Sequence, residues 1–179
     1  CFCYPGVKIP SYCAMAADPI EALTPSTMNE LQRGKAYGKV SDTMQVSVED
    51  WPCYRNNGQR SGSTQMTLAT KLNKQWETEL ACQGTQPVIV GARLWITEKD
   101  IHRVRCLDAN TGADLWQFTA GARIDSTPTF YKGRVIFGCR DGWVYCLRAL
   151  DGELAWRFRA APTQRLLVSY EQIESVWPV

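Results

Sequence analysis

The side chains of this chain that could do chemistry are eight cysteines, one histidine and a small group of charged and hydroxyl residues. Cys1, Cys3 and Cys13 lie close together at the start, where they could join a metal site or form a disulfide with a preceding segment. Paired zinc ligands normally have two or more residues between them, so the Cys-x-Cys spacing favours the disulfide. His102 has no cysteine or carboxylate at a ligand spacing, so we expect it to be structural or solvated.

A second group of such side chains occurs in two stretches, "GARIDSTP" at 121–128 and "QIESVWP" at 172–178. If the fold brings these stretches together, they could bind a cation, a small polar ligand or the basic loop of a partner. In a plainer interpretation, the two carboxylates cap turns and pair with neighbouring arginines, Arg123 or Arg140. The candidate ligand or partner contacts are Arg123, Asp125, Ser126, Glu174 and Ser175.

No catalytic, cofactor-binding or metal-binding residue is assigned from the sequence. It has no glycine-rich phosphate loop, no Ser/His/Asp arrangement and no paired-carboxylate spacing above chance. The charge is nearly balanced, with 20 basic and 18 acidic residues, and no basic stripe indicates a nucleic-acid partner. No apolar run approaches the roughly 18 residues that a membrane span needs. Because the chain opens on a cysteine and stops at "SVWPV", we interpret it as a piece of a longer protein.

The elements that must position these side chains are indicated by a repeat. "CLDANTGADLW" at 106–116 returns as "CLRALDGELAW" at 146–156, and three tryptophans are spaced 40 residues apart, at 76, 116 and 156. A period of about 40 to 45 residues is typical of a four-stranded propeller blade or of a helical pair.

The composition within one period decides between these two architectures. Short runs rich in valine, isoleucine and aromatic residues alternate with the turn signals "KG", "DG" and "DG". Asp-Gly between such runs favours β-hairpins, because glycine adopts the positive φ that these turns require. The sequence therefore predicts an all-β fold: a partial β-propeller with two complete four-stranded antiparallel blades, the start of a third, and an irregular N-terminal segment.

The repeated phrase itself is expected to join blades rather than to do chemistry. Gly112 and Gly152 supply the turn before the outermost strand, and Trp116 and Trp156 then cover the neighbouring blade. Burying one such ring removes on the order of 150–250 Å² from water. A cysteine that recurs at one register is more typical of a core position than of a disulfide.

The phrase resembles the tryptophan-docking motif of PQQ-like propellers, the repeat of the quinoprotein alcohol dehydrogenase-like superfamily. The residues that fit the motif are Cys106, Asp108, Gly112 and Trp116 in the first copy and Cys146, Gly152 and Trp156 in the second, where Arg148 replaces the aspartate. The stretch "DWPCYRNNGQRSG" at 50–62 is similar to the lead-in of such propellers in large bacterial multi-domain proteins.

These observations predict an organisation along the chain. Residues 1–49 are expected to be a linker or the tail of an upstream module, and residues 50–74 a lead-in loop. The propeller segment, 75–179, is expected to begin with a closing strand at 75–80 that pairs with strands outside this piece. It is then expected to comprise blades at 86–119 and 127–159, an insertion at 162–174 that is a short helix or a loop, and the start of the next blade at 175–179. Two blades cannot close a ring, so we expect open edges and poor folding of this chain by itself.

The functional expectation is a non-catalytic binding or scaffolding module of a periplasmic or otherwise extracytoplasmic protein. Its partners would be the remaining blades of the same chain and a protein or small polar ligand. This ligand would bind at the channel rim, the end of the central propeller channel where the stretches 121–128 and 172–178 are expected to lie. No cofactor is expected in this piece. The alternative is part of a PQQ- and calcium-dependent dehydrogenase whose catalytic residues lie elsewhere. The resemblance implies that such enzymes carry a disulfide between adjacent cysteines, and no two cysteines are adjacent here.

Overall fold

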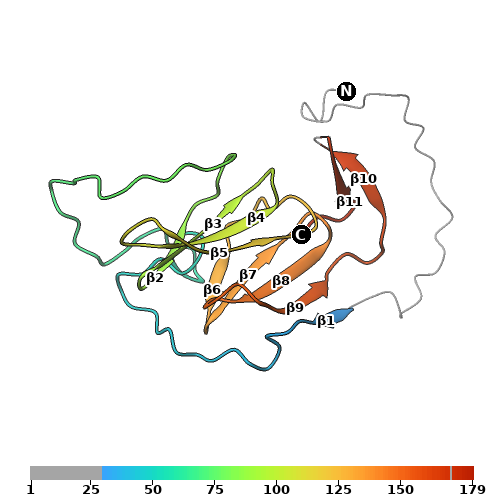
Figure 1. The fold of residues 1–179 in the computed structure, drawn as a ribbon, viewed down its shortest axis with the longest axis horizontal. Coiled ribbons are helices and arrows are strands. Elements are labelled where there is room, and N and C mark those ends of the chain that lie inside the picture. The colour runs from blue at the N-terminus through green and yellow to red at the C-terminus, as the bar shows by residue number, and fades with distance from the viewer. Residues whose placement is uncertain (1–29, 170) are drawn as a thin grey trace.

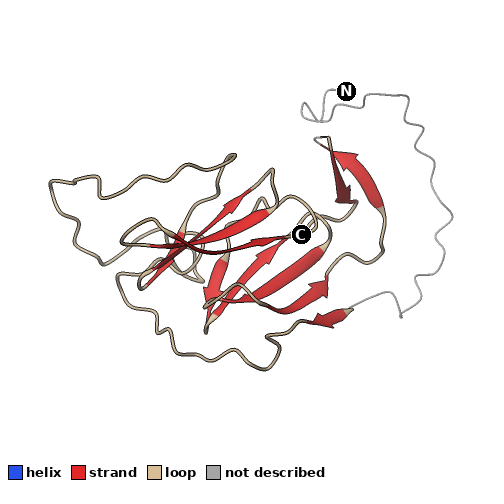
Figure 2. Ribbon diagram, in the orientation of Figure 1, coloured by secondary structure: helices blue, strands red, loops and turns tan. Residues whose placement is uncertain are grey.

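The computed structural model describes residues 30–169 and 171–179, and every regular element in them is a β-strand (Figures 1 and 2). Cys1, Cys3 and Cys13, with their predicted disulfide, lie outside the described residues. The strands form two large antiparallel sheets and one separate hairpin, and neither large sheet closes on itself. This is the all-β, partial propeller that the sequence predicts.

The first blade is a four-stranded meander in which every strand pairs with the next along the chain. Its strands are β2 (Val88–Val90), β3 (Arg93–Glu98), β4 (Arg103–Asp108) and β5 (Asp114–Thr119). The ladder between β4 and β5 shifts register between Cys106 and Leu107, inside the repeated phrase. Beside this bulge, Gly112 adopts a φ of +74°.

The second blade repeats the first and gains one strand. Its own strands are β6 (Thr129–Tyr131), β7 (Arg134–Gly138), β8 (Trp143–Arg148) and β9 (Leu154–Arg159). The bulge recurs between Cys146 and Leu147, and Gly152 has the same φ of +74°. A fifth strand, β1 (Leu31–Arg33), pairs antiparallel with the outer edge of β9.

Two parts of the structure differ from the sequence-based expectation. Residues 75–80, predicted to pair with strands outside this chain, form no strand here, which leaves that prediction untested. Residues 162–174 were expected to form a short helix or a loop. They contain β10 (Leu166–Ser169) and most of β11 (Gln172–Ser175) instead, and these two strands pair as a hairpin. Residues 176–179, where the next blade was expected to start, form no strand.

The hydrophobic core lies between the two blades. Phe118 of the first blade packs edge-on against Phe137 and Tyr145 of the second, with ring centroids 6.4 and 5.9 Å away. Nearer the inner strands, Trp95 stacks on Phe130 at 5.4 Å. These contacts join residues of different blades, so the two blades share two core clusters.

Candidate functional site

Three loops that carry the predicted site gather at one end of the sheets. In a meander, every second connection lies at the same end, so the β3–β4 turn, the β5–β6 connection and the β7–β8 turn lie together. We call these loops, residues 99–102, 120–128 and 139–142, the rim. The hairpin β10–β11 follows β9 at this same end and contacts the rim.

The rim brings the predicted charged residues into one network of ion pairs. Asp125 accepts a hydrogen bond from Arg123 Nε at 2.7 Å and a very short one from Arg140 Nε. Arg140 Nη1 also donates to Glu174 Oε2 at 2.7 Å, and Arg123 reaches Asp100 at 3.2 Å. Arg140, from the β7–β8 turn, therefore links the two stretches that the sequence singled out.

The two predicted serines have different surroundings. Ser175 is buried; its amide donates to the Arg140 carbonyl at 2.6 Å, and its hydroxyl accepts from the Trp177 amide at 3.1 Å. Ser126 lies exposed beside Asp125. Ser175 thus fastens the hairpin to the rim, whereas Ser126 faces solvent.

The electrostatics of the rim favour paired, charged side chains. Partial burial by itself would raise the pKa of Asp125, but hydrogen bonds and charges from Arg123 and Arg140 outweigh it and hold that pKa below its usual value. Burial alone would lower the pKa of Arg140, and its bonds to Glu174 and Asp125 raise it instead. Glu174 is only 2% exposed, and its second oxygen, Oε1, has no hydrogen-bond partner among the described residues.

A second charged network, in the first blade, was not anticipated from the sequence. The fully buried carboxylate of Glu98 accepts hydrogen bonds from Arg103 Nε at 2.5 Å and from the Ala81 amide at 2.8 Å. Arg105 lies 3.6 Å from the same carboxylate and forms a two-pronged pair with Asp114. The alternating arginines of "RVRCLD" could have indicated a charged network in this strand. The pattern does not indicate which carboxylate pairs with them.

Glu98 makes the unfolding equilibrium depend on pH. Burial alone would raise its pKa, yet the hydrogen bonds and charges of Arg103, Ala81 and Arg105 hold it below the usual value. A depressed pKa contributes stability that is fully present above the unfolded-state pKa of about 4.3 and lost as pH falls through the folded-state pKa. At pH 7, Glu98→Gln should lower the free energy of unfolding by about 2 kcal/mol, the usual scale for a hydrogen bond to a charged group.

Urea unfolding at pH 7, 5, 4 and 3 measures this dependence. The gap between the wild type and Glu98→Gln should shrink below about pH 4. Glu77→Gln is the matched control, because Glu77 pairs with Lys74 on the exposed surface and should change little. A constant gap across this pH range would contradict the assignment.

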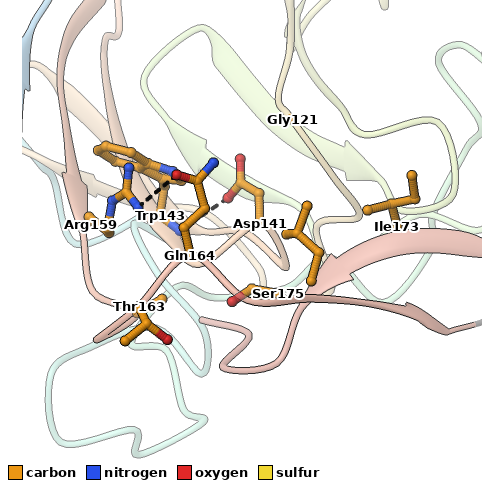
Figure 3. A pocket seen from close by; sticks show the side chains of 10 residues that line it. Gly121, Asp141, Trp143, Arg159, Thr163, Gln164, Ile173 and Ser175 are labelled. Atoms are coloured by element: carbon orange, nitrogen blue, oxygen red, sulfur yellow. Dashed lines mark hydrogen bonds between the residues drawn. The ribbon is translucent and has the colours of Figure 1, made fainter. Parts of the chain in front are cut away.

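A cavity of about 340 Å³ opens between the end of the second blade and the hairpin (Figure 3). Its walls include Trp143, whose ring lies under the guanidinium groups of Arg157 and Arg159 at 4.4 and 4.7 Å. Asp141 accepts hydrogen bonds from the Trp143 amide at 3.0 Å and from the Tyr145 hydroxyl at 2.5 Å. No sequence pattern indicated this cavity, because its walls come from four separate segments.

The hairpin carries exposed apolar side chains, of which Leu166 and Ile173 border the cavity. Val168 and Ile173 lie directly opposite each other on its two strands and are 68% and 64% exposed. At its tip, Gln172 donates to the Asp100 carbonyl at 3.0 Å and contacts His102 Nε2 at 2.9 Å. His102 therefore holds the hairpin against the first blade, and the described residues contain no group of three cysteine, histidine or acidic side chains that could hold a metal ion.

The tryptophan of the first copy of the repeated phrase lies where the two blades meet. Trp156 of the second copy was predicted to cover a neighbouring blade, but it borders a groove on the outer face of the second blade, where no further blade follows among the described residues. The Trp116 indole donates to the Ala149 carbonyl at 3.1 Å, and its ring fills the space over Gly152, whose added Cβ would lie 2.5 Å from Trp116 Cε3. Trp76 repeats this geometry one blade earlier, with a 3.0 Å bond to the Ala109 carbonyl and its ring over Gly112. Trp76 and Trp116 thus each contact the glycine turn of the next blade.

The other residues of the phrase shape the turn and fill the core. Asp108 Oδ1 accepts hydrogen bonds from the amides of Asn110 and Thr111, both at 2.9 Å. In the second copy, where Arg148 stands in place of this aspartate, Asp151 pairs with Arg148. The two cysteines of the phrase are fully buried, and burial raises the pKa of each to about 11, so both remain neutral thiols at neutral pH.

The fold and the repeated joints define a partial β-propeller with PQQ-like repeats. The family model described as outer membrane protein assembly factor BamB matches residues 60–175, and the chain belongs to this family. No curated protein sequence matches the chain. Among the described residues, none belongs to a helix long and apolar enough to cross a bilayer.

Several solved structures are similar to parts of this chain. The BamB of Moraxella catarrhalis is 25% identical over 48% of this chain and 28% of its own, with a TM-score of 0.44. The quinohemoprotein alcohol dehydrogenase of Comamonas testosteroni is 18% identical over 62% of this chain and 19% of its own, with a TM-score of 0.53. The corresponding dehydrogenase ADHIIG of Pseudomonas putida HK5 is 16% identical over 64% and 19%, with a TM-score of 0.51. The two dehydrogenases support the fold alone, and the aligned region spans less than a third of each relative.

Proposed function

We propose that this chain is a non-catalytic binding module of an extracytoplasmic protein, and that it binds another protein through the β10–β11 hairpin at the rim. The observation that carries the proposal is the exposed apolar pair Val168 and Ile173, with Leu166 beside them at 58% exposure. Exposed apolar side chains that share one face are typical of protein interaction sites. Because Gln172 and Glu174 fix the hairpin to the body, it offers this face with little loss of conformational entropy on binding.

The rim chemistry supports binding rather than catalysis. Asp125 and Glu174 both pair with Arg140, so a calcium ion would have to displace a guanidinium group to use them. Asp125 and Glu174 therefore do not offer a calcium ion free carboxylate ligands in this arrangement. The description of the matching family model, an outer membrane protein assembly factor, is consistent with a protein partner and with an extracytoplasmic location.

Site-specific photo-crosslinking tests the proposed binding face. The intact protein is made in its own cells with a photoreactive amino acid in place of Val168. Irradiation should give a discrete crosslinked product with a second protein. The control position is Leu72, an exposed apolar residue of the lead-in at 79% exposure, which should give none. Products that are absent at Val168, or identical at both positions, would contradict a specific site on the hairpin.

Calorimetric titration of the intact protein with PQQ and calcium separates the two functional classes. The proposal expects no saturable heat. Saturable binding at micromolar concentration or tighter, about −8 kcal/mol, would favour the dehydrogenase and lead to assays with alcohols and sugars.

A further inference from the structure

Residues 30–53, expected to be linker and lead-in, run across both blades in the structure (Figure 1). They begin beside β9, the outer edge of the second blade, and end against β2 and β6, the innermost strands of the two blades. We call this segment the strap. It contacts the edges of β9, β2 and β6, whereas the outer edge of β5 pairs with no strand of the described residues.

The outer end of the strap extends the ladder of β9. The Arg159 amide donates to the Glu30 carbonyl at 2.9 Å, and the Gly34 amide donates to the Ala155 carbonyl at 2.9 Å. Side chains reinforce the pairing: Gln32 accepts from Arg157 at 2.7 Å, and Glu30 pairs with Arg159 at 3.1 Å.

The fit at this end is close. A Cβ added to Gly34 would lie 2.1 Å from the Leu154 carbonyl oxygen, so only glycine allows the two backbones to approach. Two residues later, Ala36 is fully buried against Cys146 and Ala155 on the outer face of the second blade. The strap therefore covers both the edge of β9 and part of the adjoining apolar face.

The middle of the strap crosses the β6–β7 turn. The carbonyl oxygen of Ser41 lies 2.3 Å from the position that a Cβ on Gly133 would take. Val40 packs close by, against the same outer face. The chain passes around the end of the second blade opposite to the rim.

The inner end of the strap pairs with the first strand of each blade. Trp51 and Ile89 exchange both backbone hydrogen bonds, at 2.8 and 3.0 Å, and the Phe130 amide donates to the Pro52 carbonyl at 2.8 Å. The carboxylate of Asp50, only 6% exposed, accepts from the Gly91 amide at 2.8 Å. These bonds occupy edges that would otherwise face the axis of a propeller.

We propose that the strap is an intramolecular edge cover: it keeps the two-blade chain monomeric, and release of its outer end allows β9 to pair with a second copy. An uncovered strand edge presents unpaired amides and carbonyls to any other chain. Release would also uncover the groove formed by Val144, Trp156 and Phe158, which Leu31 and Tyr37 now border. The proposal is independent of the binding role of the hairpin.

The test compares the full 179-residue chain with its Gly34→Val variant, which the Leu154 carbonyl does not accommodate. Wild type should sediment as a monomer, and the variant should form concentration-dependent dimers. Hydrogen exchange at the Arg159 amide, which donates to the strap, should become at least ~10-fold faster in the variant, because local opening frees that bond. Gly58→Val is the matched control, since nothing lies within 4 Å of a Cβ at Gly58.

A second variant guards against a general folding defect in Gly34→Val. Glu30→Ala combined with Gln32→Ala removes two strap contacts with β9 without adding atoms, and it should speed Arg159 exchange ~2- to 5-fold. An oligomeric wild type would overturn the proposal. So would unchanged exchange at Arg159 in both variants, or fast exchange in Gly34→Val with no self-association.

Discussion

Replacing Trp116 by alanine is expected to lower the free energy of unfolding by about 3 kcal/mol, the lower end of the range for large-to-small substitutions of buried aromatic rings, because this ring is partly buried. The ring lies over Gly152 of the next blade and packs into both core clusters, so its loss leaves a void where the two sheets meet. It also removes the donor to the Ala149 carbonyl.

Urea unfolding followed by circular dichroism measures the effect, with Trp156→Ala as the control. Trp156 holds the same place in the repeat but borders an open groove, so its replacement should cost only about 1 kcal/mol. Equal losses for the two variants would show that docking onto the glycine turn contributes nothing beyond the burial of an aromatic ring.

Replacing Gly152 by alanine should destabilise the chain by about 3 kcal/mol, through two separable causes. A left-handed φ of +74° costs an L-residue roughly 1 to 2 kcal/mol. Overpacking against Trp116, whose Cε3 atom would lie 2.5 Å from the new Cβ, costs a further 1 to 3 kcal/mol.

Gly91→Ala separates these causes. Gly91 also has a positive φ, +57°, but nothing lies within 4 Å of a Cβ there, so only the conformational cost of about 1 to 2 kcal/mol is expected. The double variant, Trp116→Ala with Gly152→Ala, should lose at least about 1 kcal/mol less unfolding free energy than the sum of the two single-variant losses. The reason is that both changes act on one contact. Full additivity, or equal losses for the two glycine variants, would exclude the docking contact as the cause.

The candidate site was predictable only as a set of positions. Asp125 precedes the inner strand β6, as its place in the repeat indicates, whereas Glu174 reaches the rim from β11 of the hairpin, because residues 176–179 form no inner strand of a further blade. The sequence left open whether these carboxylates bind a ligand or pair with arginines. Arg140 decides this, because it reaches both carboxylates from the β7–β8 turn.

The sequence by itself determined the blades and their joints. Turn glycines and alternating β-branched residues act within a few residues, and the 40-residue period repeats one supersecondary unit, so both can be seen without a structure. The predicted turn positions at Gly112 and Gly152 agree with their positive φ values.

Only the tertiary structure decided what covers the blades. The pairing of Gln32 with Arg157 joins residues 125 positions apart, and the Glu98 carboxylate accepts a hydrogen bond from Ala81, 17 positions earlier in the chain. Residues 75–80 resemble a strand yet form none, whereas Leu31–Arg33 form one. The physical reason is that a strand needs a free edge beside it, and which edges are free follows from the packing of the whole chain rather than from any local pattern.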